Sequence, residues 1–120
     1  MAGMVVTTEE TFGSVKKISF DWLSSAGGAA DATTTYIYNG QLLRMVLFPD
    51  AAGTQPTDQY DVLLNDADGY DLLNGQGANC SNAATHELTV GLGAVAGDAL
   101  TLGVTNAGNA TGGIVTVYLR

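Results

Sequence analysis

The clearest pattern in the chain is an alternation of apolar and polar residues over residues 15–23. Ile18, Phe20 and Trp22 occupy every second position, and the positions beside them are Lys, Ser and Asp. A period of two places the three large apolar side chains on one face of a strand, whereas on a helix Phe20 would point away from the other two. The pattern therefore predicts a strand with one face in a core.

A second alternation closes the chain. Residues 113–119 place Ile114, Thr116 and Tyr118 on one face of a predicted strand. A loop rich in Asn and Gly over residues 106–112 precedes it and separates it from another predicted strand at residues 99–105.

The middle of the chain predicts two further strands. Residues 41–48 are apolar on both faces, with Arg44 as their only charge, and they are too few before Pro49 for a helix. We expect a central strand whose outer face meets another subunit. Residues 33–38 are β-branched and aromatic and favour a strand. Asn39-Gly40, between the two, suits the positive φ angles of a type I′ hairpin turn.

Weaker segments complete the predicted strands. Residues 59–64 and 70–73 flank a turn of Asn, Asp and Gly at residues 65–69, which indicates a hairpin. Shorter strands are expected at residues 5–11 and 87–92.

Seven or eight short strands at this spacing are typical of sandwiches and barrels. We therefore expect an all-β protein: a single-domain antiparallel β-sandwich, jelly-roll-like, over residues 13–120. Residues 1–12 are expected to form an N-terminal arm, because Met4, Val5 and Val6 have little reason to be buried internally. A chain of 120 residues can bury one core without disulfides or metals.

The composition favours strands over helices. Charged residues make up only 13% of the chain, so the exposed Glu, Lys and Arg that a helical bundle needs are scarce. No run of about 18 apolar residues occurs, so no transmembrane helix is expected.

The charge is strongly acidic, with 12 Asp and Glu against 4 Lys and Arg and a net charge of −8. Residues 45–119 contain no Lys or Arg. Nucleic acids and anionic membranes both require a basic surface, so neither is expected as a partner.

The cysteine content and the first residues indicate where the protein is made. Cys80 is the only cysteine, which excludes an intrachain disulfide and a cysteine-based zinc site. The first residues lack the basic and apolar regions of a signal peptide. We expect synthesis in a reducing cytoplasm without export by the general secretory route.

Residues suited to catalysis are sparse. A nucleophile needs a base within hydrogen-bond reach, and the one histidine, His86, has only Cys80 as a conceivable partner, with no motif around either residue. We expect no enzyme, no catalytic residue, no cofactor and no multi-histidine metal site.

One acidic cluster stands out in the sequence. It comprises Asp58, Asp61, Asp66, Asp68 and Asp71. The preferred interpretation is structural, because Asp side chains cap backbone groups in tight turns. In the alternative, Asp66, Asp68 and Asp71 bind Ca²⁺, although the EF-hand spacing lacks its closing glutamate. A pair of glycosidase carboxylates is a further alternative.

Aromatic residues could form a carbohydrate-binding surface. Trp22 alternates in step with Ile18 and Phe20 and is expected in the core. Tyr36 and Tyr38 share a face of their predicted strand, where they are either exposed or packed across strands.

Four segments carry a resemblance to known proteins, and it runs from about residue 11 to residue 120. They are FGSVKKISFDW, ATTTYIYNGQLLRMVLFPD, YDVLLNDADGYDLLNGQGAN and GNATGGIVTVYLR. In composition and order they resemble structural proteins of tailed bacteriophages, particularly the small β-sandwich decoration, or cement, proteins of capsids. They contain no catalytic signature.

This resemblance implies a non-enzymatic virion protein, made in the host bacterial cytoplasm, that binds the outside of the phage head and stabilises contacts between capsomers. The implied partners are the major capsid protein and further copies of the chain, in a dimer or trimer. A low-copy tail, neck or fibre-associated protein and a lectin-like carbohydrate-binding module are the alternatives.

Contacts of this kind use broad surfaces. The candidate segments are the N-terminal arm, residues 41–48 and the loops of small residues. The candidate contact residues are Met4, Val5, Val6, Lys16, Lys17, Leu43, Arg44 and Met45.

Overall fold

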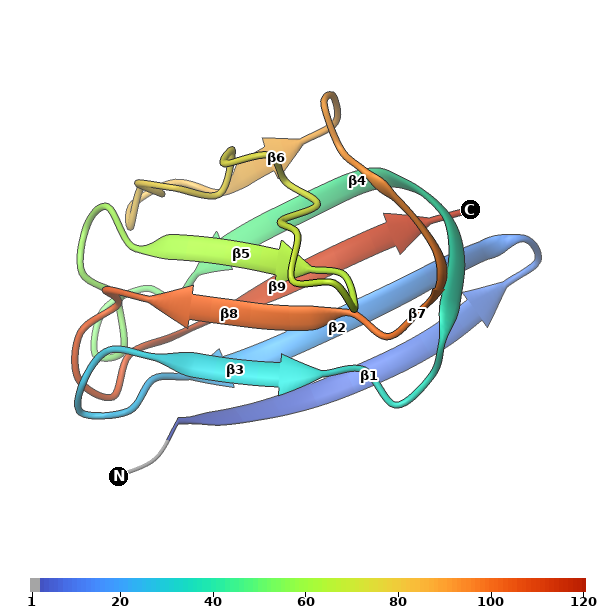
Figure 1. The fold of residues 1–120 in the computed structure, drawn as a ribbon. Helices are drawn as coiled ribbons and strands as arrows, with labels where there is room; N and C mark the ends of the chain where they lie inside the picture. Colours follow the sequence, from blue (N-terminus) through green and yellow to red (C-terminus); the bar gives the residue numbers. More distant parts are fainter. Residues whose placement is uncertain (1–2) are drawn as a thin grey trace.

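Nine antiparallel β-strands make up the computed structural model, which describes residues 3–120 (Figure 1). The strands are β1 (Met4–Phe12), β2 (Val15–Leu23), β3 (Ala30–Thr33), β4 (Tyr38–Pro49), β5 (Asp61–Asn65), β6 (His86–Leu88), β7 (Ala94–Asp98), β8 (Thr101–Thr105) and β9 (Gly112–Leu119). The large sheet has the order β1-β2-β9-β4-β6, with β7 paired to β4, and the small sheet has the order β3-β8-β5. The prediction of an all-β, single-domain sandwich is confirmed, with nine strands instead of seven or eight. No helix within the described residues is long and apolar enough to cross a membrane.

The strand pairing is that of a jelly roll. β2 pairs with β9, β3 with β8, and β4 with both β6 and β7. Early strands thus pair with late ones in nested order, as in a long hairpin that is folded over to form two sheets. One consequence is that the last strand, β9, lies in the middle of the large sheet between β2 and β4.

The core lies between the two sheets. Ile18, Phe20 and Trp22 of β2 are at most 2% exposed, which confirms the face predicted from their alternation. The Trp22 ring meets the ring of Tyr60, just before β5, with 5.8 Å between centroids. Every buried side-chain nitrogen and oxygen of the described residues has a hydrogen-bond partner. This core fixes the large sheet as a rigid layer.

Residues 4–12 form an edge strand of the large sheet, and the expectation of a separate arm is corrected. β1 pairs with β2 over nine residues. The turn between them has Gly13 at a φ of 61°, the first central position of a type II′ turn, which favours glycine. Val5 packs against the core while Met4 and Val6 are exposed, so the segment alternates like any half-buried strand. Residues 1–2 of the expected arm lie outside the described residues.

The predicted hairpin turn at Asn39-Gly40 is wrong. β4 begins at Tyr38, and its first residues pair with β7. Gly40 does have a positive φ, of 131°, but its Cα lies against the chain end: a Cβ there would be 2.6 Å from the carbonyl carbon of Arg120. The strand expected at residues 33–38 ends at Thr33, and residues 34–37 connect the two sheets.

A bulge in β4 decides which of its residues face the core. The register between β4 and β9 shifts between Leu42 and Arg44, so Leu43 is an extra residue. Leu42 and Met45 are therefore both directed inward, at 2% and 0% exposure, although they are three residues apart. β4 lies between β9 and β6, as expected of a central strand.

Candidate functional site

The outer face of the large sheet is the candidate functional site. We use this name for the side chains that point away from the small sheet. They belong to every second residue of β1, β2 and β9 and, beyond the bulge, to every second residue of β4. The registers align these residues into rows that cross the four strands.

One row of the outer face is charged. Glu10, Lys17, Tyr118 and Arg44 stand side by side on successive strands. The Tyr118 ring lies between the two cations, 5.9 Å from Lys17 Nζ and 5.4 Å from Arg44 Cζ, which are distances suited to cation–π attraction. Arg44 Nε also donates to Glu87 on β6. This row holds two of the four Lys and Arg of the chain.

The opposite end of the outer face is mainly apolar, with Asp21 as its one charged residue. Val6, Asp21, Ile114 and Phe48 form a row there, and Met4 lies one row beyond. Met4, Val6 and Phe48 are 59%, 65% and 47% exposed. Grouped exposed apolar side chains of this kind mark interaction surfaces.

Four of the eight predicted contact residues share the outer face. Met4 and Val6 lie at its apolar end, and Lys17 and Arg44 lie in its charged row. The sheet register places residues from β1, β2 and β4 on one face, whereas the sequence analysis could identify them only one segment at a time.

The other four lie elsewhere. Met45 is fully buried, so it cannot be a surface contact, which corrects the prediction for this residue. Val5 is partly buried and packs against the core. Leu43 is the partly buried bulge residue of β4. Lys16 lines a hollow at one end of the sandwich.

Ile114 and Tyr118 were missed as contact candidates, and Phe48 was included only as part of the candidate segment 41–48. The alternation of residues 113–119 did place Ile114 and Tyr118 on one face. It could not show which face was outward, because both faces of that strand are largely apolar.

The acidic turn after β5 is built on backbone hydrogen bonds. Asp66 Oδ1 accepts from the N–H groups of Asp68 and Tyr70, at 3.0 and 2.9 Å. The Asp71 carboxylate accepts from the N–H groups of Leu64, Leu73 and Gly75. These are the capping contacts that the structural interpretation expects.

The remaining carboxylates of this cluster also cap loops. Asp58 accepts from the N–H of Asn82, and Asp61 from Asn79 and Asn106. Within residues 3–120, no three His, Cys, Asp or Glu side chains are grouped to hold a metal ion.

Cys80 is a core residue. Its thiol is fully buried and donates to the carbonyl of Gly77, at 3.1 Å, whereas His86 is exposed. Burial raises the pKa of the thiol to about 11, so it stays protonated at neutral pH and is a poor nucleophile.

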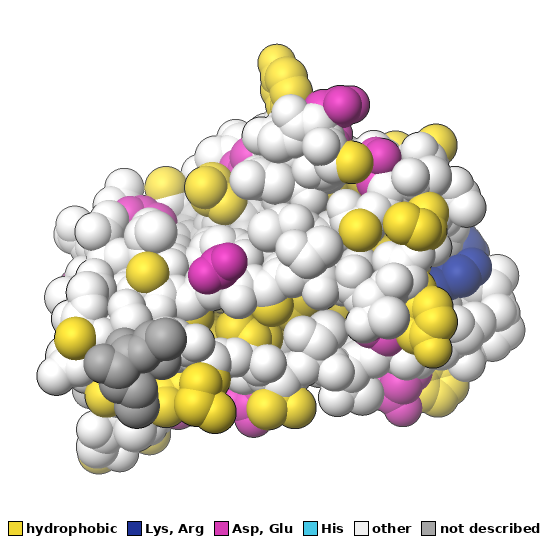
Figure 2. All heavy atoms as spheres, turned by 60° about the horizontal axis from the view of Figure 1, so that its bottom comes forward, with side chains coloured by type: hydrophobic (Ala, Val, Ile, Leu, Met, Phe, Trp, Pro, Cys, Tyr) yellow, Lys and Arg dark blue, Asp and Glu magenta, His cyan; other side chains and the backbone are white. Residues whose placement is uncertain are grey.

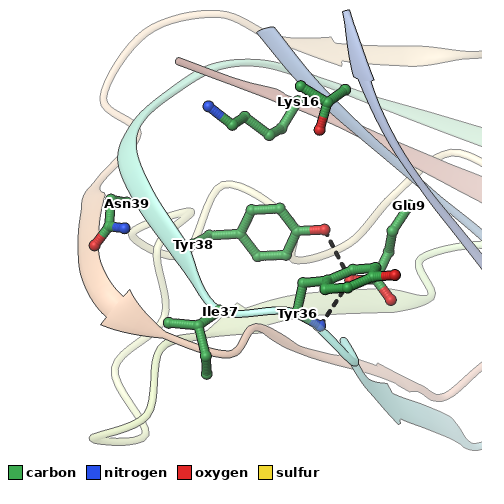
Figure 3. A pocket seen from close by; sticks show the side chains of 7 residues that line it. Glu9, Lys16, Tyr36, Ile37, Tyr38 and Asn39 are labelled. Atoms are coloured by element: carbon green, nitrogen blue, oxygen red, sulfur yellow. Dashed lines mark hydrogen bonds between the residues drawn. The ribbon is translucent and has the colours of Figure 1, made fainter. Parts of the chain in front are cut away.

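A hollow of about 400 Å³ opens beside β1, where Glu9, Lys16, Tyr36, Ile37 and Asn39 contribute to its wall (Figure 3). The Glu9 carboxylate accepts from the N–H of Tyr36 at its edge. The Tyr36 ring, 63% exposed, stands at the open side of this hollow.

Tyr38 differs from Tyr36, and the expectation that they share a face is wrong. Residues 34–37 are not a strand, so the alternation does not apply. Tyr38 is 5% exposed and donates its hydroxyl to Glu9, at 2.7 Å.

Comparison with protein-family models, curated proteins and solved structures finds no match to this chain.

Proposed function

We propose that the chain is a capsid decoration protein of a tailed bacteriophage, a non-enzymatic virion protein that binds the outside of the head and stabilises contacts between capsomers. The outer face of the large sheet is the observation that carries the proposal. It offers exposed apolar side chains and a charged row on a rigid jelly roll. Together with the resemblance of four segments to decoration proteins, it supports the major capsid protein as the partner.

The size of the surface suits this role. A standard interface takes about 800 Å² from each partner, about one seventh of the 5936 Å² surface of this chain. One broad side of a two-layer sandwich can supply that share. Many copies bound at equivalent joints would add buried area to a capsid without chemistry.

The charge distribution supports docking through the outer face. Lys17 and Arg44 lie on it together with Glu10 and Asp21, and Arg44 pairs with Glu87, so the face offers charges of both signs in a chain with a net charge of −8. A partner surface with complementary charges of both signs would fix the register of docking.

The first experiment is to count the chain in purified particles by quantitative mass spectrometry against the major capsid protein. A copy number comparable with that of the capsid protein supports a place on the shell. A much lower number favours a tail, neck or fibre-associated position, and absence from the particle overturns a virion role.

A substitution on the outer face tests the docking surface. We expect Phe48→Glu to weaken binding to undecorated heads about tenfold or more, because it places a charge in the apolar end of the interface. Tyr70→Glu is the matched control, since Tyr70 is 76% exposed in the turn after β5, outside the outer face. Both variants should melt near the wild-type temperature. Unchanged head binding by Phe48→Glu would remove the outer face from the proposal.

The hollow beside β1 favours one alternative, a lectin-like module. An exposed tyrosine ring beside Glu9, Lys16 and Asn39 offers both a stacking surface and polar groups for a sugar. Binding of the purified chain on a glycan array, and its loss with Tyr36→Ala, would favour this second function.

A further inference from the structure

β1 has the longest free edge in the described chain. It pairs with β2 on one side, and no strand within residues 3–120 pairs with its other side (Figure 1). β1 has nine residues, whereas the other strands at sheet ends, β3, β5, β6 and β7, have five or fewer. A free edge presents unpaired N–H and C=O groups that can pair with another strand.

The hairpin between β1 and β2 fixes which backbone groups are free. The two residues that flank a two-residue turn form a hydrogen-bonded pair, which here is Phe12 and Val15. Because hydrogen-bonded pairs alternate along an antiparallel ladder, the backbone of Phe12 and of every second residue before it in β1 is bonded to β2. The N–H and C=O groups of the alternate residues point to the free edge. These residues are Val5, Thr7, Glu9 and Thr11.

β1 lacks most of the features that keep strand edges apart, although it carries the charged side chains of Glu9 and Glu10. It contains no Pro and no Lys, and its register with β2 runs without a bulge. Met4, Val6 and Phe12 are 59%, 65% and 58% exposed along it. Figure 2, seen from the side on which β1 and β3 lie, shows hydrophobic side chains at several points of this surface, some of them at the floor of a shallow hollow.

We propose that β1 pairs antiparallel with β1 of a second copy, around a two-fold axis at Thr8, so that the two large sheets form one continuous sheet. The proposal rests on the edge of β1 alone and is independent of the proposed function. All nine residues of each strand then have a partner, and the residues that point to the edge form about eight backbone hydrogen bonds.

The side chains of β1 fit a second copy in this register. Met4 faces Phe12 of the second copy, Val6 faces Glu10, and Thr8 faces Thr8 at the axis. A thioether beside an aromatic ring at each end is favourable, and no two like charges are directly opposite. Glu9 lies on the inner side, opposite Thr7 of the second copy, and its carboxylate accepts from the N–H groups of Thr35 and Tyr36 of its own copy.

A cysteine at the axis provides a direct test. Thr8 is expected in a non-hydrogen-bonded pair with its own copy, where Cα atoms lie about 4.5 Å apart, within the range for a disulfide. Thr8→Cys should therefore form an interchain disulfide in air. Ser19→Cys is the matched control, because Ser19 pairs with Thr8 on β2 and lies three strand spacings, about 14 Å, from its copy. The native Cys80 is fully buried and should not react.

A proline on the free edge tests the hydrogen bonds. Thr7→Pro removes an N–H that points away from β2, so the fold should persist while the dimer dissociation constant rises about tenfold or more. Thr7→Val keeps the N–H and the shape and should stay dimeric. Circular dichroism and thermal melting report the fold, and analytical ultracentrifugation reports the mass.

The expected result is a wild-type dimer, a reducible dimer of Thr8→Cys and a monomeric, folded Thr7→Pro. A wild-type chain that stays monomeric at ~100 µM, with a free thiol in Thr8→Cys, would overturn the proposal. The free edge of β1 would then be available only to a strand from another protein. A dimer that persists in Thr7→Pro and does not cross-link through Thr8→Cys would overturn it as well, because the copies would then meet elsewhere.

Discussion

At Gly113 the absence of one carbon atom lets β9 pass between two neighbours. A Cβ at this position would lie 2.5 Å from the carbonyl oxygen of Phe48 and 3.0 Å from the Trp22 ring. Neither neighbour can move freely, since one is backbone of β4 and the other is a core side chain. Gly103 on β8 is different, because a Cβ there would meet nothing within 4 Å.

We therefore expect Gly113→Ala to lower the free energy of unfolding by about 2 kcal/mol or more, through overpacking of the core. Gly103→Ala, in a comparable strand, should change it by less than about 1 kcal/mol. Urea denaturation of both variants measures the difference. Equal effects would mean that the approach of Gly113 to Trp22 is not what makes glycine necessary there.

Among the elements, β1 is tied to the β3–β4 connection by Glu9. Its carboxylate accepts from the N–H groups of Thr35 and Tyr36 and from the hydroxyl of Tyr38. Burial alone would raise the pKa of Glu9, but the hydrogen bonds from these three residues outweigh burial and hold this pKa below its ordinary value. The contact therefore favours the charged carboxylate and links the edge of the large sheet to a crossing between sheets.

A lowered pKa in the folded state gives a definite pH dependence. The stabilisation by Glu9 is complete above the pKa of the unfolded chain, about 4.3, and is lost as the pH falls through the lower folded value. Glu9→Gln should lower the melting temperature at pH 7 and bring the variant closer to the wild type at pH 3. A constant difference from pH 7 to pH 3 would show that the charge of Glu9 does not stabilise the fold.

The elements also differ in how far the sequence predicts them. β2 and β9 are predictable because a long alternation is visible in each. The Asn, Asp and Gly residues of the turn after β5 likewise indicate the caps made by Asp66 and Asp71. β7 was missed because its residues, AVAGD, are small and only Val95 is buried. The bulge at Leu43 was not predictable, because it depends on the register with β9, and for the same reason Met45 was expected at the surface. The rows of the outer face were not predictable either, because they depend on the registers between strands, which the pattern of one strand does not show.

The whole molecule carries a net charge of −8 on a compact body with a radius of gyration of 13.3 Å. Like charges at this density repel one another, and salt screens them. Raising NaCl from about 0.01 M to about 0.15 M shortens the Debye length from about 30 Å to about 8 Å. We expect the melting temperature to rise over this range, measured on Thr7→Pro so that dimer formation does not contribute. A fall would mean that attractive pairs such as Arg44 and Glu87 outweigh the repulsion.

The proposed dimer and the proposed docking surface are compatible in the assembled molecule. A two-fold axis between antiparallel strands of one sheet is perpendicular to that sheet, so both outer faces would point to the same side. Two weak contacts made by one rigid pair reinforce each other through their high effective concentration. A particle surface with matching sites would then hold the pair more tightly than either copy alone.

The position of β9 in the middle of the large sheet has a consequence for biosynthesis. β2 and β4 are each bonded to β9, which is synthesised after the other eight strands, so until then both have an unpaired inner edge. The sandwich can close only after β9 has been synthesised, and pairing between segments so distant in sequence is slow. During this interval the acidic charge of the nascent chain opposes aggregation of its apolar strands.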